Sequence, residues 1–457
     1  MNYQQALDYI LSFADFERSG RFADRPDLTP VRSLLQRLGD PQRGRTTVHV
    51  AGSKGKGSVA AILESVLRHA GFRTGLFTSP HLHSFCERIR IDGQPVEEGE
   101  FVHLAEAVQP AVAAEMAARP QRQFVTFDLL TAMAFLAFRD GGAQVQVVEV
   151  GLGGRLDSTN LLDEKDVCII SPISLEHTAV LGDTVERIAV EKAAIVQPGA
   201  SVVMAPQAYP EAAAAVRRAA AQAGAEVVEV AANYRWERLS HDLEGQEARL
   251  SGPGGVRDLR LSLLGGFQLE NAATALAAVD VLRARALPGP SVGRPVGPGR
   301  RGHAIGDDAI ARGLAAVRWP GRLEVLSPAP LIVADGAHNR DSARCLRESL
   351  DYFSRRRTFF IVGTLTDKDV AAIAAELAPL ADRVIACGFD HPRAMAPEAI
   401  AAAFADTGRP AQVRQTLAGA IEEAVALADP DWLICITGAV AVAAVARSAL
   451  ARLLRRR

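Results

Sequence analysis

Blocks of consecutive hydrophobic residues alternate along this chain with amphipathic segments of helical period. Apolar runs at Thr46–Ala51, Val145–Val150 and Val167–Ser171 each end in a polar or glycine-rich loop, and the first leads into the helix-period segment Val59–Ala70. Short apolar runs bounded by loops are typical of buried strands in a parallel sheet. The alternation therefore predicts βαβ units, with helices covering both faces of the sheet.

The pattern changes twice further along. Residues 234–264 are polar and irregular with a Gly-Pro-Gly-Gly turn, which predicts an antiparallel excursion, and Ala272–Ala286 reads as an alanine-rich helix. The stretch 288–302 is rich in proline and glycine and predicts a flexible loop or linker. A short helix is expected over Asp307–Val317.

A second α/β pattern occupies the end of the chain, with strands expected near residues 331–335, 358–363, 383–387 and 432–437. We therefore predict an α/β protein of two domains. The second would have about 140 residues, which is an ordinary size for a domain. Residues 1–317, including the loop 288–302, form a P-loop ATPase-like domain with a mainly parallel sheet. Residues 318–457 form a smaller Rossmann-like domain.

Composition narrows the function classes. Lys and Arg number 51 against 53 Asp and Glu in 457 residues, so no basic excess suggests nucleic-acid or membrane binding. The five cysteines are scattered without a CxxC pair, which argues against a zinc site or a disulfide framework. An acidic, amphipathic start without signal-peptide character completes the expectation of a cytoplasmic protein.

A glycine loop follows the first predicted strand. It supplies glycines whose backbone N–H groups can surround phosphate oxygens, a lysine for charge and a hydroxyl for magnesium. The expected nucleotide contacts are Gly52, Ser53, Lys54, Gly55, Lys56, Gly57 and Ser58. The spacing is not the common GxxxxGK[ST], so a plain strand-to-helix turn is the competing interpretation.

The loop resembles AGTNGKGS of the Mur ligase superfamily, in its folylpolyglutamate synthase/dihydrofolate synthase branch. Further segments resemble the same family in the same order, over nearly the whole chain. They are Thr78–Leu82 (TSPHL) with Glu87–Ile89 (ERI), Glu149–Asn160 (EVGLGGRLDATN), Ser174–Thr178 (SLDHT), Glu191–Ala193 (EKA), Trp319–Glu324 (WPGRLE), Asp335–Asn339 (DGAHN) and Asp367–Asp369 (DKD).

The resemblance implies a magnesium site. Its ligands would be Ser58, Glu149 and His177, with Lys192 carbamylated to present a carboxylate-like group to a second ion. From the residues alone, Glu149 could instead form a buried salt bridge, because a charge that ends an apolar strand needs a partner. His177 could be a core histidine, and Lys192 could pair with its neighbour Glu191 on a helix surface.

The resemblance also implies nucleotide and reaction contacts outside the loop. Asn271 and Arg322 would contact ATP, although Asn271 could instead be a helix N-cap. Asp335 and His338 would contact nucleotide or reactants, and we count them with Lys56 and Lys192 as candidate catalytic residues. An Asp-Gly turn is the alternative for Asp335. Ligands divided between two domains would meet only when the domains close.

The acceptor side is expected at Ser79, Pro80, His81 and Arg88, which resemble the loop beside the pterin pocket. Arg88 could instead be an exposed strand charge. Asp157 could accept paired N–H bonds from an aminopterin edge. A turn-capping role for Asp157 is equally compatible with the sequence.

The resemblance implies a monomeric ATP- and Mg²⁺-dependent ligase that adds L-glutamate to dihydropteroate, to the γ-carboxylate of (tetrahydro)folate, or to both, through an acyl phosphate. The near alternative is a Mur-type ligase for another carboxylate. A P-loop kinase or motor would need regular Walker spacing, and a noncatalytic scaffold should have lost Lys56, Ser58, Glu149 or His177.

The chain departs from the family pattern inside the loop, where Lys54 replaces Asn and Ser53 replaces Thr. Cys86, Phe267 and Arg340 are further departures. None of them removes a candidate metal ligand.

Overall fold

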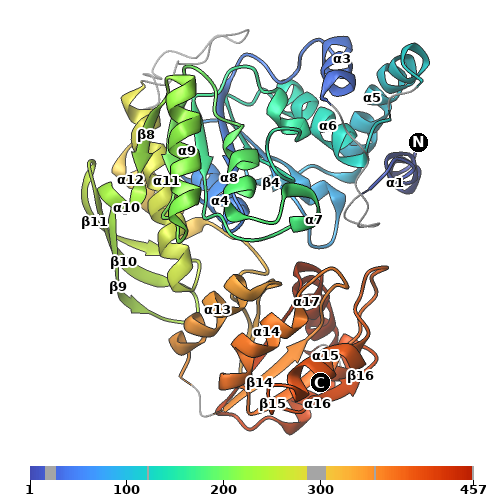
Figure 1. The fold of residues 1–457 in the computed structure, drawn as a ribbon, viewed down its shortest axis with the longest axis vertical. Helices are drawn as coiled ribbons and strands as arrows, with labels where there is room; N and C mark the ends of the chain where they lie inside the picture. The colour runs from blue at the N-terminus through green and yellow to red at the C-terminus, as the bar shows by residue number, and fades with distance from the viewer. Residues whose placement is uncertain (16–26, 121–122, 286–304, 355–356, 455–457) are drawn as a thin grey trace.

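Two large β-sheets organise the chain, one in each half, and a smaller three-stranded sheet lies beside the first (Figure 1). The computed structural model describes residues 1–15, 27–120, 123–285, 305–354 and 357–454. The predicted loop 288–302 lies outside these residues. The predicted α/β class with two mainly parallel sheets is confirmed.

The N-terminal sheet has eight strands in the order β4-β3-β2-β5-β1-β6-β7-β8. Strands β2, β5, β1, β6, β7 and β8 run parallel, whereas β3 and β4 are antiparallel at one edge. The strands are β1 (Thr46–Ala51), β2 (Thr74–Phe77), β3 (Ile89–Ile91), β4 (Gln94–Pro95), β5 (Val145–Glu149), β6 (Val167–Ile170), β7 (Ser201–Met204) and β8 (Glu226–Glu229).

Helices cover both faces of this sheet, as the continuous apolar strands require. Val147 faces the core formed with α4, α11 and α12, and its neighbour Val148 faces the core formed with α1, α3, α5 and α6. Helices α8 and α9 cover β6 and β7 on that second face. The helices are α1 (Tyr3–Leu11), α3 (Thr29–Arg37), α4 (Lys56–His69), α5 (Glu98–Ala118), α6 (Thr126–Asp140), α7 (Thr178–Leu181), α8 (Val185–Ala193), α9 (Pro210–Ala223), α10 (Val230–Asn233), α11 (Gly266–Ala284) and α12 (Asp307–Ala316).

The predicted antiparallel excursion is a three-stranded sheet of β9 (Arg235–His241), β10 (Gln246–Gly252) and β11 (Gly255–Leu261). It packs beside α11 and α12 and extends toward the second domain (Figure 1). Helix α11 begins at Gly266, six residues before the predicted alanine-rich helix. The prediction starts late because the first turn has a mixed composition without a helix-favouring pattern.

The C-terminal sheet has the order β12-β13-β17-β14-β15-β16, parallel except for β12. One core lies under α13, α14 and α15, and the other under α16 and α17. The elements are β12 (Glu324–Pro328), β13 (Leu331–Ala334), β14 (Arg357–Val362), β15 (Arg383–Cys387), β16 (Gln412–Arg414), β17 (Trp432–Thr437), α13 (Arg340–Ser349), α14 (Val370–Leu377), α15 (Pro397–Ala405), α16 (Leu417–Leu427) and α17 (Val440–Leu454).

The predicted domain boundary at 317/318 falls between α12 and β12, which belong to different halves of the molecule. Within the described part of the chain, no helix combines the length and the apolar character needed to cross a membrane.

Candidate active site

Three neighbouring strands present the predicted site residues at one edge of the N-terminal sheet. The order β5-β1-β6 places the loops after these parallel strands side by side. The glycine loop follows β1, Glu149 ends β5, and Glu176 with His177 follows β6. The carboxyl edge of such a sheet is where ligands bind in α/β proteins.

The glycine loop is packed so closely that side chains could not replace its glycines. A Cβ on Gly52 would lie 1.9 Å from Ser171 Oγ, and a Cβ on Gly55 would lie 2.3 Å from Asn271 Oδ1. Gly55 is also the N-cap of α4 at φ +79°. The first N–H groups of α4 therefore point into the loop, which is the arrangement that binds phosphate.

Helix α11 supplies side chains over the start of α4. Gln268 Nε2 lies 3.4 Å from Ser58 Oγ, and Asn271 Nδ2 donates to Gln268 Oε1 at 3.0 Å. Asn271 lies inside α11, so its alternative role as a helix N-cap is wrong. Sequence reasoning missed Gln268. Its i,i+3 spacing from Asn271 was the available signal, because such residues share one helix face.

Lys192 is a buried residue at the end of α8 and does not pair with its neighbour Glu191. Its Nζ donates to Gly52 O and to Glu176 Oε1, each at 2.8 Å. Lys56 Nζ donates to Gly52 O at 3.1 Å. Burial alone would raise the pKa of Glu176, but the ammonium groups of Lys192, Lys54 and Lys56 hold it well below the usual value.

The surface-pair alternative for Lys192 is therefore wrong, because Glu191 instead binds Arg155 at 2.8 Å. Burial lowers the pKa of Lys192. The charge of Glu176 and its hydrogen bond with Lys192 act on this pKa in the opposite direction.

Glu149 is buried, and its Oε2 accepts the backbone N–H of Ser79 at 3.1 Å. Burial raises its pKa to about 7, although Lys56, Arg322 and Arg88 act in the opposite direction. The buried salt bridge that the sequence allowed is not formed, since no cation within the described residues lies in ion-pair contact with Glu149. A hard divalent cation would supply the missing charge.

His177 adopts a left-handed backbone, φ +48°, as the N-cap of α7. Burial lowers its pKa to about 4, so the imidazole is neutral at pH 7 and suited to bind a metal. Among the residues that the structure describes, no three His, Cys, Asp or Glu side chains converge. The hydroxyl of Ser58 and the carboxylate of Glu149 are the oxygen ligands that Mg²⁺ prefers, and the metal-binding role of Ser58, Glu149 and His177 stays a prediction.

The predicted acceptor loop is held by one carboxylate and one arginine. Glu87 accepts three backbone N–H groups of the loop, from Leu82, His83 and Ser84, at 2.8–3.1 Å. Arg88 is buried, so it is not an exposed strand charge. Its Nε donates to His81 Nδ1 at 2.8 Å, which leaves the proton of this imidazole on Nε2.

Asp157 caps the 3₁₀ turn that follows it, Ser158–Leu161. It accepts the N–H of Leu152 at 2.9 Å and the N–H of Thr159 at 3.0 Å, and it also bonds to the Thr159 hydroxyl. These contacts fit the turn-capping alternative. Its contact with a pterin edge stays a prediction.

The second domain supplies Arg322, Asp335 and His338. Asp335 accepts the N–H groups of Leu323 and Ala337, each at 2.8 Å, and burial raises its pKa. His338 Nδ1 lies 2.8 Å from Gly336 O, so Nδ1 carries the proton and Nε2 is an acceptor. Burial, reinforced by nearby lysines, lowers the pKa of His338 to about 3.

The two domains meet beside the glycine loop. The positive charge of Arg322 acts to lower the pKa of both Glu149 and Asp335, which belong to different domains. The guanidinium of Arg90 lies 5.5 Å from the ring of Trp319, and a Cβ on Gly57 would lie 2.8 Å from the same ring. The acceptor loop and these seam residues line one narrow pocket.

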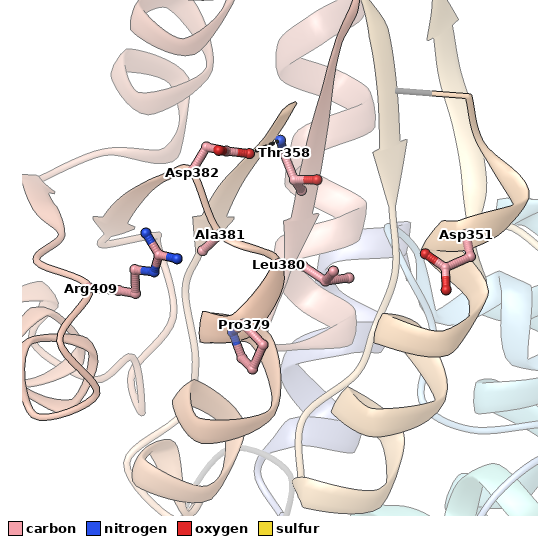
Figure 2. A pocket seen from close by; sticks show the side chains of 7 residues that line it. All are labelled: Asp351, Thr358, Pro379, Leu380, Ala381, Asp382 and Arg409. Atoms are coloured by element: carbon pink, nitrogen blue, oxygen red, sulfur yellow. Dashed lines mark hydrogen bonds between the residues drawn. The ribbon is translucent and has the colours of Figure 1, made fainter. Parts of the chain in front are cut away.

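A larger cavity of about 410 Å³ lies elsewhere, in the C-terminal domain (Figure 2). Its lining includes Thr358 at the start of β14 and Asp382 just before β15, joined by a hydrogen bond of 2.8 Å. It therefore lies at the amino ends of these parallel strands, opposite to the edge where ligands bind, and we assign it no role.

Comparison with known proteins gives the same two-part division. Residues 50–279 match the Mur ligase middle domain, and residues 321–440 match the Mur ligase glutamate ligase domain. The chain is 36% identical to a Mycobacterium tuberculosis dihydrofolate synthase/folylpolyglutamate synthase, over 93% of this chain and 90% of that protein. It is 32% identical to a Lacticaseibacillus casei folylpolyglutamate synthase, over 98% of this chain and 99% of that protein.

Solved structures agree with this relationship. Mycobacterium tuberculosis folylpolyglutamate synthase complexed with ADP superposes with a TM-score of 0.87 at 34% identity, covering 98% of this chain and 97% of that one. An FPGS–AMPPCP–folate complex gives a TM-score of 0.82 at 30% identity, covering 98% of this chain and all of that one. The chain belongs to the folylpolyglutamate synthase/dihydrofolate synthase family of ATP-dependent ligases, and it carries the Mur ligase middle and glutamate ligase domains.

Proposed function

We propose that this protein uses ATP and Mg²⁺ to join L-glutamate to dihydropteroate and to the γ-carboxylate of tetrahydrofolate. Residues 1–317 bind the nucleotide and the folate, and residues 318–457 bind glutamate. The observation that carries the proposal is the glycine loop after β1, flanked by Glu149 and His177 from the strands on either side, with Arg322 of the second domain acting on the pKa of Glu149. The ADP and AMPPCP complexes of its relatives support ATP as the phosphoryl donor.

The phosphates lie at the N-terminus of α4, where backbone N–H groups and Lys56 bind them. Asn271 and Gln268 hold the loop from the side of α11. Ser58, Glu149 and His177 would hold Mg²⁺, which would neutralise part of the phosphate charge. Glu149 is the one anion among these three residues, so the negative charge of the nucleotide would strengthen the binding of the ion.

The reaction begins when a carboxylate oxygen of the acceptor attacks the terminal phosphorus of ATP. ADP leaves, and an acyl phosphate forms. Lys56 and Arg322 stabilise the charge on the transferring phosphoryl group. The amine of glutamate then attacks the acyl carbon, and the tetrahedral intermediate expels inorganic phosphate.

The incoming ammonium group of glutamate must lose a proton before its nitrogen can attack. His338 offers a fixed Nε2 acceptor, because its Nδ1–H is held by Gly336 O. Its low pKa makes it a weak base, so it orients the amine by accepting one of its N–H groups, and the proton leaves directly to phosphate or water. Asp335 sets the geometry of this turn through its two backbone N–H bonds.

Lys192 contributes in one of two chemical forms. As an ammonium it neutralises Glu176 and holds Gly52 O, which fixes the start of the glycine loop. Burial lowers its pKa, and in its deprotonated form the amine would react with CO₂ to give the carbamate that the family resemblance implies, a carboxylate-like ligand for magnesium. Intact-mass measurement in bicarbonate buffer, with Lys192→Arg as control, distinguishes the two forms.

The acceptor enters through the narrow pocket that His81 and Arg90 line together with the seam residues Trp319 and Arg322. Arg88 is buried, and its charge acts to lower the pKa of Glu149, so we infer that it attracts the acceptor carboxylate toward the bound nucleotide. The Nε2–H of His81 is a second donor.

Phosphate release from Mg-ATP, measured with dihydropteroate and with tetrahydrofolate in parallel, tests this proposal. We expect release only when acid and glutamate are both present, and a product heavier by one glutamate residue. Turnover with one acid alone would restrict the activity to that acid. ATP binding without turnover on either acid would favour a Mur-type ligase for another carboxylate.

A further inference from the structure

Lys54 is the residue by which the glycine loop departs most from the family pattern, and its position is chemically unusual. Its Nζ is buried from solvent and has no hydrogen-bond partner among the described residues. The nearest carboxylate, Glu176, lies 3.7 Å away, within ion-pair range but beyond a hydrogen bond. A buried ammonium without hydrogen bonds is costly, so the arrangement indicates that a ligand completes it.

The charges around Lys54 do not balance. Three lysines, Lys54, Lys56 and Lys192, lie at the glycine loop. Among the described residues, Glu176 is the one carboxylate within 4 Å of the ammonium groups of these lysines. Its Oε1 is taken by Lys192 at 2.8 Å. The two remaining positive charges call for an anion with several oxygens, and a phosphate chain provides one.

The side of the loop on which Lys54 lies identifies the part of the phosphate chain. Two charged groups of the second domain lie near enough to affect the pKa of Lys54: Lys368 lowers it and Asp341 raises it. Lys54 in turn lowers the pKa of His338. Lys54 therefore faces the seam between the domains, where the acceptor and glutamate must approach. The terminal phosphoryl group is the one that must face them, because it is transferred.

Two departures from the family segments meet here. The family loop has Asn where this chain has Lys54, and the family segment SLDHT has Asp where this chain has Glu176. The extra methylene of Glu176 lets one carboxylate face both Lys192 and Lys54. The longer side chain of Glu176 thus holds Lys54 by charge, while the ammonium group of Lys54 keeps its hydrogen-bond donors unused.

We propose that Lys54 is a second phosphate-binding lysine of this loop, whose ammonium binds the terminal phosphoryl group of ATP and stays with that group as it passes to the acceptor carboxylate. Glu176 holds the ammonium near this position before the nucleotide binds. This inference rests on the proposed function and adds to it a contact specific to the third phosphate.

The test compares two nucleotides that differ at that phosphate. Titration calorimetry measures the dissociation constants of MgAMPPCP and MgADP for the full chain and for Lys54→Met, which keeps an unbranched apolar stem without the charge. We expect Lys54→Met to weaken MgAMPPCP by about 10- to 100-fold, the range for a charge-assisted hydrogen bond. MgADP should change by less than about threefold, and Lys54→Arg should retain most of the affinity for MgAMPPCP.

Each other result has a defined meaning. Equal losses for both nucleotides would show that Lys54 only shapes the loop, and unchanged affinity for both would show that it serves Glu176 alone; either overturns the proposal. A raised KM for glutamate with unchanged MgAMPPCP affinity would assign Lys54 to the glutamate carboxylates and also overturn it. Failure of the unaltered chain to bind either nucleotide would contradict the proposed function itself, so the two failures are distinguishable.

Discussion

The buried carboxylate of Glu149 should destabilise the protein when no metal is bound, and replacing it should therefore stabilise the metal-free chain. Glu149 carries its negative charge in a buried position with a single backbone N–H donor at 3.1 Å. Glu149→Gln keeps the size of the side chain and an oxygen that can accept this N–H. It removes the charge.

The size of the effect follows from the pKa, which burial raises from 4.5 to about 7. A raised pKa in the folded state means that stability present at low pH is lost as the pH rises through the folded pKa. At about 1.4 kcal/mol per pKa unit, the loss is below about 1 kcal/mol at pH 5 and about 3 kcal/mol above pH 8. The advantage of Glu149→Gln should grow over the same interval.

Urea unfolding in EDTA between pH 5 and pH 8.5 measures this difference, with the N-terminal domain followed by hydrogen–deuterium exchange of β1 and β5 peptides. Mg²⁺ with nucleotide at about 100 times its dissociation constant should then stabilise the unaltered protein by about 2.7 kcal/mol, and Glu149→Gln much less. Glu64→Gln is the matched control, because Glu64 is also buried with a raised pKa but pairs with Thr74 away from the site. It should keep the full response to Mg²⁺ and nucleotide.

Two results would refute the reasoning. If Glu149→Gln is less stable than the unaltered protein at pH 8 without metal, the carboxylate has a compensating partner. If the difference is independent of pH, the charge of Glu149 is not its cause.

Three further expectations concern the loop, the second domain and the contact between domains. Gly55→Ala would place a Cβ 2.3 Å from Asn271 Oδ1 at φ +79°, so calorimetry should detect no nucleotide binding while circular dichroism stays unchanged; retained affinity would contradict the loop geometry. Asp335→Asn replaces one of the two oxygens that accept backbone N–H groups with an amide NH₂. We expect about 1–3 kcal/mol lower stability in urea and at least tenfold lower kcat, whereas unchanged kcat would remove Asp335 from the site. Tyr352→Leu removes the ring 3.6 Å from the guanidinium of Arg238, a contact between the two domains worth about 0.5–2 kcal/mol. Small-angle scattering should then show a larger radius of gyration with nucleotide affinity retained. An unchanged radius would show that this contact does not hold the domains together.

Much of the fold could be predicted because the strands that form it are continuous apolar runs. The runs at β1, β5 and β6 are buried on both faces, and this pattern is specific to a parallel sheet between helices. The order of the strands in the sheet could not be predicted from the hydrophobic pattern, because it depends on where each connection crosses to reach the next strand. The adjacency β5-β1-β6, which brings Glu149 and His177 to the glycine loop, came from the structure.

The site could be predicted residue by residue only where a motif carried it. Gln268 escaped because its one signal, the i,i+3 spacing from Asn271, depends on knowing that α11 begins before both residues. The environment of Lys192 escaped for a different reason: a lysine beside a glutamate in the sequence suggests a surface pair, yet α8 turns the lysine inward to Glu176, sixteen residues earlier in the chain. Pairings between distant segments depend on tertiary packing, which local sequence does not contain.

The buried charge of Lys54 shows the same limit. The sequence placed an additional cation in the loop, but only the structure shows that its ammonium lacks a hydrogen-bond partner and faces the second domain. A departure from a family pattern becomes a functional hypothesis when the surrounding charges are known.

The measurement that tests the account most directly follows an oxygen atom. Tetrahydrofolate labelled with oxygen-18 in its γ-carboxylate is turned over with Mg-ATP and glutamate, and the released phosphate is analysed by mass. Because the acceptor carboxylate attacks phosphorus and the C–O bond later breaks, each phosphate should carry one labelled oxygen, and the amide should keep the other. Unlabelled phosphate with both labelled oxygens left on unreacted acid would show that ATP is hydrolysed without forming an acyl phosphate, and would contradict the account.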